Sequence, residues 1–195
     1  FINILTKVMN FKLRRLKHLK KELLTKLAVL IILVYIIVLV FLLYRPFFIF
    51  FFLLFLASIS RMYNHIYWLP QLGFELYSTA TILTGLLLGP WLGLLQGILS
   101  QFFAYFFSGK IKHYALIGII SWAIIGFICG LIRNLNISVT KIGIFFIVLY
   151  EGITTPLFRL SGVRTFSAIF HLITHIIIGI FLFSTLAPIL YNILR

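Results

Sequence analysis

The sequence contains very few acidic residues: Glu22, Glu75 and Glu151 are the three carboxylates, and there is no aspartate. Without an aspartate, no Ser-His-Asp triad can be assembled. No GxxxxGK[ST] stretch occurs, which argues against an ATPase activity of the chain's own. The single cysteine, Cys129, excludes a disulfide framework and a cysteine-pair metal site. We therefore expect neither an enzyme nor a bound cofactor.

Charged residues of either sign are scarce, at 10% of the chain, whereas 63% of the residues are hydrophobic. In a soluble domain about a quarter of the residues are charged, so most of this exterior must face something other than water. The apolar residues come in long blocks, which indicates spanning helices rather than barrel strands. A helix also satisfies its backbone hydrogen bonds within one segment. We predict an all-α, multi-pass integral membrane protein of a prokaryotic cell membrane.

The apolar blocks predict a six-helix transmembrane core, preceded by one N-terminal apolar helix at about 27–43. Gly89-Pro90 interrupts the long run from Leu76 to Phe107, because a Gly-Pro pair ends one helix and starts the next. We assign residues 27–195 to a single transmembrane domain. Its core segments are expected at about 47–60, 74–88, 91–108, 113–132, 142–160 and 167–191.

Basic residues are concentrated at the start of the chain, which has a net charge of +14. Residues 1–26 interleave lysine and arginine with leucine and phenylalanine, which predicts an amphipathic interfacial segment. We expect it to bind the anionic headgroups of the bilayer, and we expect no nucleic-acid partner. The side that the N-terminus faces stays open, because the positive-inside rule and the family resemblance described below favour opposite orientations.

Two stretches of the sequence carry glycine at every fourth residue. Small residues at this spacing let helix backbones approach closely. Such close packing matters in a membrane because lipid supplies little hydrophobic drive for helix association. We favour packing within the chain over an interface with another subunit. The glycines are Gly85, Gly89, Gly93 and Gly97 in one stretch and Gly126 and Gly130 in the other.

Polar side chains also fall inside the predicted spanning segments, where charge is costly. Glu151, Thr155 and Arg159 follow i, i+4, i+8 spacing, and His171 and His175 are four residues apart. Two interpretations stay open: a polar binding cavity, or a structural pair in which Glu151 bonds a histidine or Arg159. Further polar groups near the middle of segment 91–108 are Gln96, Ser100 and Gln101.

Two histidines at i, i+4 spacing are also able to chelate a metal ion. However, the stretch HLITH lacks the glutamate that follows the first histidine of a zinc-protease helix, and Leu172 stands there instead. We therefore expect no metal site.

A set of short motifs resembles a known transporter family. Residues 57–61 read Ala-Ser-Ile-Ser-Arg, and Leu69-Pro70 follows them. Residues 82–85 read Ile-Leu-Thr-Gly and are followed by Leu88-Gly89-Pro90, Gly93 and Gly97. Later in the chain, residues 122–130 read Trp-Ala-Ile-Ile-Gly-Phe-Ile-Cys-Gly. This pattern resembles the substrate-binding S components of energy-coupling factor (ECF) vitamin transporters. The likeness covers roughly residues 47–191, which is six helices, the number that the family uses.

The resemblance implies a subunit that captures a vitamin or a precursor from outside the cell. It would dock onto a transmembrane coupling subunit driven by two ATPase subunits, and topple in the membrane to release its cargo. The ligand would lie under the loop from Arg61 to Gly73, whose aromatic residues suit stacking on a planar heterocycle. The expected substrate-binding residues are Tyr63, Asn64, His65 and Trp68 in the loop, Glu75, Arg159, Arg164 and His171 toward the same outer side, Glu151 and His175 deeper, and Gln101 and Thr155.

Two other functions stay open. The first is a non-transporting scaffold, similar to the small multi-helix proteins of the bacterial rod-shape machinery, which needs no ligand cavity. The second is a membrane enzyme that acts on lipid, with Glu151 and a histidine as acid and base. The inward polar set of Glu151, His171 and His175 favours the solute-binding subunit over both.

Overall fold

The computed structural model describes residues 30–38, 44–62, 73–109 and 114–195, and these residues form helices and connecting turns without a strand. The chain divides into two units, Phe1–Arg45 and Pro46–Arg195. Residues 30–38 of the first unit are helical, within the predicted helix at 27–43. That residues 27–195 form a single transmembrane domain stays a prediction. The basic segment 1–26 lies outside the described residues.

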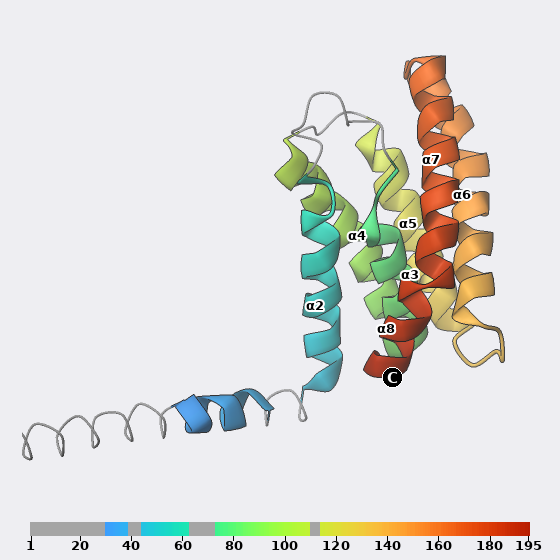
Figure 1. Ribbon diagram of the computed structural model, residues 1–195. Coiled ribbons are helices and arrows are strands. Elements are labelled where there is room, and N and C mark those ends of the chain that lie inside the picture. Colours follow the sequence, from blue (N-terminus) through green and yellow to red (C-terminus); the bar gives the residue numbers. More distant parts are fainter. Residues whose placement is uncertain (1–29, 39–43, 63–72, 110–113) are drawn as a thin grey trace, which may run out of the picture. The chain divides into compact units, whose positions relative to one another are not determined.

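The second unit is a bundle whose first four helices are α2 (Arg45–Ile59), α3 (Leu76–Leu88), α4 (Pro90–Ser108) and α5 (Ala115–Leu131). The chain continues through α6 (Val139–Leu160), α7 (Thr165–Ser184) and α8 (Leu186–Leu194). Helices α3, α4 and α5 pack on one another, and α6 packs along α7 (Figure 1). The short α8 returns against α3 and α6.

A tight reversal joins α3 to α4. Gly89 has φ 101° and ψ 179°, a backbone conformation that favours glycine, and its N–H donates to the carbonyl of Gly85 at 2.9 Å. Pro90 is the first residue of α4, where its fixed φ suits a helix start and its missing N–H would have no helical partner. The predicted division of the long apolar run at Gly89-Pro90 is therefore confirmed.

The regularly spaced glycines lie where α3, α4 and α5 meet. A Cβ atom added to Gly93 would collide with the carbonyl oxygen of Gly126, and one added to Gly126 would collide with that of Gly93. Gly97 approaches the backbone of Trp122 in the same way, and Gly130 approaches that of Pro90. These contacts confirm that the glycines serve packing within the chain, because two helices meet here backbone to backbone.

The predicted segment 167–191 consists of two helices. Pro188 has no N–H, and its ring would collide with the carbonyl of Ser184 if one helix ran through. The helix breaks at Thr185 instead, where φ is −121° and ψ is −69°. The Thr185 hydroxyl donates to the carbonyl of Phe181 at 2.7 Å and so satisfies an acceptor at the end of α7.

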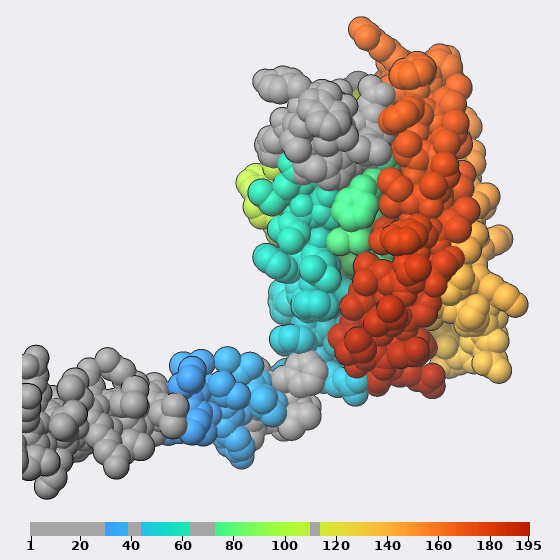
Figure 2. All heavy atoms as spheres, viewed as in Figure 1, coloured from blue at the N-terminus to red at the C-terminus, as the bar shows by residue number. Residues whose placement is uncertain are grey.

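The exterior of the bundle is apolar. Large side chains on several helices are mostly exposed, among them Phe51 at 61%, Leu116 at 63%, Phe145 at 60% and Phe181 at 64%. Figure 2 shows the face on which α2, α7 and α8 lie. By length and composition, α6 and α7 are able to cross a membrane: their 22 and 20 residues cover about 33 and about 30 Å at about 1.5 Å per residue. The other four predicted spans stay a prediction.

Candidate functional site

Five charged or titratable side chains from separate parts of the chain meet inside the bundle. We call them the polar cluster: Arg61 follows α2, Glu75 directly precedes α3, Glu151 lies in α6, and His171 and His175 lie in α7. Glu75, Glu151 and His175 are each only 1% exposed. Buried charges of this kind need partners, and the structure supplies them.

The first partnership joins α6 to α7. Glu151 Oε1 lies 2.5 Å from His175 Nδ1 and 3.8 Å from His171 Nε2. The Thr155 hydroxyl, one turn further along α6, donates to Glu151 Oε2 at 2.8 Å. The two imidazole rings stack with centroids 5.5 Å apart, because residues four apart share one helix face. Both oxygens of Glu151 are thereby engaged.

The second partnership joins Arg61 to Glu75. Arg61 Nη2 lies 2.9 Å from Glu75 Oε1, and the guanidinium lies over the ring of Tyr105, 4.6 Å from its centroid. Glu75 is the N-cap residue of α3, but its side chain caps no backbone N–H of that helix. The carboxylate is therefore used for the ion pair inside the bundle and not for the helix terminus.

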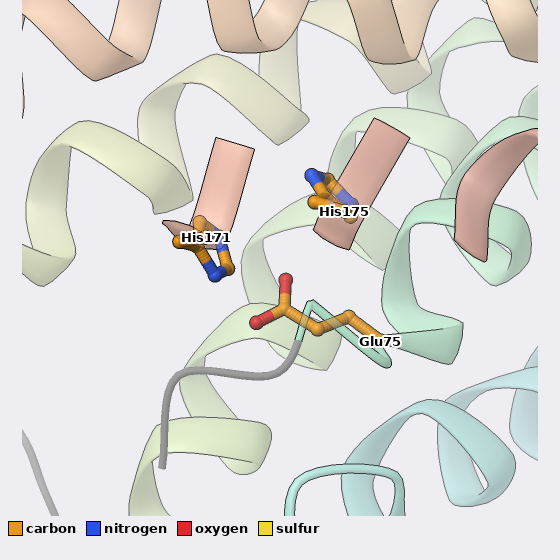
Figure 3. A group of neighbouring side chains, drawn as sticks. All are labelled: Glu75, His171 and His175. Atoms are coloured by element: carbon orange, nitrogen blue, oxygen red, sulfur yellow. The ribbon is translucent and has the colours of Figure 1, made fainter. Parts of the chain in front are cut away.

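A close backbone contact brings Glu75 to the histidines. The N–H of Gly73 donates to the hydroxyl of Thr174 at 3.1 Å, and a Cβ atom at Gly73 would collide with the backbone of His175. Only glycine allows the chain to lie this close to α7. As a result, one ligand atom each of Glu75, His171 and His175 lies within 4.8 Å of the others (Figure 3).

A cavity of about 100 Å³ opens beside the polar cluster. This volume holds several water-sized molecules, whereas a site for a drug-sized ligand usually measures about 300–1,000 Å³. Aromatic rings from α3, α4 and α6 form much of its wall. The lining residues are Arg61, Tyr77, Tyr105, Tyr114, Tyr150, Phe158, Val163, Ser167, Ala168 and His171.

The structure separates the predicted site residues into groups. It brings together Glu75, Glu151, Thr155, His171 and His175. It places Arg159 and Arg164 on the exposed surface, and the guanidinium of Arg159 donates to the hydroxyl of Thr165. Gln101 is buried in α4 but does not line the cavity. The loop residues Tyr63, Asn64, His65 and Trp68 lie outside the described residues.

The exposure of Arg159 follows from helix geometry. Each step of four residues advances the helix by about 40° beyond a full turn, so a residue at i+8 points about 80° away from the first. Glu151 is buried, Thr155 is half-buried and Arg159 is exposed, as this drift requires.

Several residues around the cavity were missed among the predicted site residues, above all Arg61 and the tyrosines that line the cavity. The useful signal was the tyrosine itself, because a phenol within an apolar helix needs a polar neighbour. Tyr77, Tyr105 and Tyr150 all occur within apolar stretches and are buried.

No known family model, curated protein or solved structure matches the chain. The relation to ECF S components therefore rests only on the motifs quoted above and stays a prediction.

Proposed function

We propose that this chain is a multi-pass membrane protein that captures a small micronutrient from outside the cell as the solute-binding subunit of an ATP-driven importer. The observation that carries the proposal is the polar cluster beside the cavity. Charge at the centre of a bilayer costs about 2.5–3.5 kcal/mol per residue on insertion scales, and such residues usually mark a functional site. A scaffold needs neither the cluster nor the cavity.

The apolar exterior supports the membrane location. In α6 and α7 only 39% and 28% of the apolar stretch is buried within the protein, so both helices direct most of it outward. The core helix of a soluble protein would bury most of such a stretch. Together with the buried Glu75 and Glu151, this apolar outer surface of α6 and α7 supports the proposed membrane location.

The proposed partners follow from what the chain lacks and from the family resemblance. The sequence contains no phosphate-binding loop, so ATP hydrolysis would be supplied by separate ATPase subunits. A transmembrane coupling subunit would connect them to this chain. The basic segment 1–26 would bind anionic lipid headgroups beside this assembly.

The membrane proposal is tested by labelling both ends of α6. In a Cys129→Ala background, Ser138→Cys and Gly162→Cys place one thiol just before and one just after the helix. A membrane-impermeant maleimide applied to intact cells should label only one of the two, and the other should react after permeabilisation. Labelling of both in intact cells, or of neither before permeabilisation, would show that α6 does not cross.

The binding proposal is tested by thermal unfolding of the detergent-purified protein with a panel of vitamins, vitamin precursors and metal ions. A solute at about 100 times its Kd should stabilise the native state by about 2.7 kcal/mol. The shift should be lost in His171→Ala and kept in Arg164→Ala, whose side chain is exposed outside the cavity. If nothing in the panel stabilises a folded sample, the solute-binding function is refuted.

A further inference from the structure

Glu75, His171 and His175 form a set of three ligating side chains. One ligand atom of each lies within 4.8 Å of the other two, and Figure 3 shows the Glu75 carboxylate extending toward the two imidazole rings. Two imidazoles and one carboxylate are the three protein ligands of many zinc sites in which a fourth position stays open. This set favours divalent ions of the zinc, cobalt and nickel type over magnesium or calcium, which prefer oxygen ligands alone.

The hydrogen bond from His175 to Glu151 holds the imidazole ring in an orientation that suits a metal ligand. Its Nδ1 is held by Glu151 at 2.5 Å, while its Nε2 is buried and has no hydrogen-bond partner in the part of the chain that the structure describes. With a proton on Nδ1 donated to Glu151, the lone pair on Nε2 is available. A carboxylate behind a metal-bound histidine is the usual second partner, because it fixes the tautomer and the ring orientation.

Glu75 is arranged in a similar way. Arg61 contacts Oε1 at 2.9 Å, whereas Oε2 is buried and has no hydrogen-bond partner among the described residues. With both histidines neutral, the two glutamates and the arginine together carry one net negative charge, which a bound cation would offset. Burying a net charge away from water is costly, so a bound cation would stabilise the cluster.

We infer that Glu75, His171 and His175 bind a divalent transition-metal ion, and that this ion is the solute of the importer proposed above, on which the inference rests. The cavity supports the assignment. His171 lines it, and its volume of about 100 Å³ leaves room for the water that would complete the coordination. A vitamin-sized molecule would need a space several times larger.

The experiment uses the full-length chain, purified in detergent and treated with a chelator, with Co²⁺ as the spectroscopic probe. The expected result is one Co²⁺ per chain, with visible d–d bands of a nitrogen- and oxygen-ligated site that disappear when Zn²⁺ displaces the cobalt. Glu75→Gln and His171→Asn should each abolish these bands. Glu151→Gln replaces the carboxylate behind His175 by an amide, leaves the three proposed ligands in place and should weaken affinity about 10–100-fold.

The matched control is His18→Asn, which removes a histidine of the basic N-terminal segment and should bind Co²⁺ like the parent. Circular dichroism and thermal unfolding of each apo variant establish that it is folded. Because Glu75→Gln and His171→Asn alter different parts of the chain, at least one should retain the fold.

Three results would overturn the inference alone, and a fourth would refute the proposed function with it. If the folded parent chain binds neither Co²⁺ nor Zn²⁺, the proposed metal site does not exist. If a vitamin nevertheless stabilises this chain, the proposed importer function is retained. Equal binding by Glu75→Gln, His171→Asn and the parent would place the ion elsewhere. Unfolding on chelation would make the ion a structural element and not a solute. Absence of stabilisation by every ion and vitamin would refute the proposed function as well.

Discussion

The contact between Gly93 and Gly126 predicts that a single methyl group will destabilise the bundle. In Gly126→Ala, the new Cβ would overlap the carbonyl oxygen of Gly93 and lie 2.8 Å from the Thr81 methyl group. The oxygen belongs to a helix backbone and cannot rotate away. Overpacking of this kind costs about 1–3 kcal/mol, while alanine regains about 1 kcal/mol of helix propensity over glycine.

Gly152→Ala is the matched control, because it makes the same change inside α6 at a position where a Cβ atom meets nothing within 4 Å. Both variants gain the same helix propensity, so the difference between them isolates the overlap. Gly126→Ala should be less stable than Gly152→Ala by about 1–3 kcal/mol. In a chain of this size that corresponds to a Tm difference of about 2–12 °C.

The assay is thermal unfolding of both variants in the same detergent, followed by circular dichroism at 222 nm and by tryptophan fluorescence. A lower midpoint in Gly126→Ala than in Gly152→Ala supports the backbone contact between α4 and α5. Equal midpoints in the two variants would refute it, because helices that tolerate the methyl group cannot be in backbone contact at this position.

Three further predictions concern buried polar groups, and thermal unfolding checks each of them. Glu151→Ala and His175→Ala should be coupled by about 0.5–3 kcal/mol in a double-mutant cycle, and additive effects would show that the hydrogen bond contributes nothing. Arg61→Gln should lower the free energy of unfolding by about 3–5 kcal/mol, because it leaves Glu75 charged and buried without its cation. Adding Glu75→Gln should restore most of this stability. A double variant as unstable as the single one would contradict the ion pair. Gln101→Leu should stabilise the protein by about 1–3 kcal/mol, because both amide atoms are buried without a hydrogen-bond partner in the described residues, and a lower midpoint would mean that the amide is satisfied in solution.

Local rules explain the parts of the fold that could be predicted. Gly89-Pro90 divides a helix through its own backbone preferences, and the four-residue spacing of glycine identifies a contact face without knowledge of its partner. We missed the break between α7 and α8 because we predicted segment 167–191 from the length of its apolar stretch and did not consider Pro188. A proline inside a helix removes one backbone hydrogen bond, and its ring collides with the carbonyl four residues earlier, however apolar the segment is.

The site could be predicted only where one helix face determines it. The inward positions of Glu151 and His175 follow from their place within apolar helices, so their partnership was among the interpretations. The approach of Glu75 to His171 and His175 could not be foreseen in this way. It depends on how closely Gly73 approaches α7, which is a tertiary contact between segments that are remote in sequence.

The two kinds of helix contact give the bundle parts of different stiffness. Helices α3, α4 and α5 meet through their backbones, whereas α6 and α7 meet through side chains, with Phe183 against Gly143 and Ile147 against Gly179. Side chains change rotamer more readily than carbonyls move, so we expect α6 and α7 to slide past each other more easily than α3, α4 and α5 do. A ligand bound by Glu75 on one side and by the α7 histidines on the other would connect the rigid helices α3, α4 and α5 to the more mobile pair α6 and α7. Occupancy would then be signalled at the outer surface of α6 and α7, where a partner subunit could distinguish a loaded protein from an empty one.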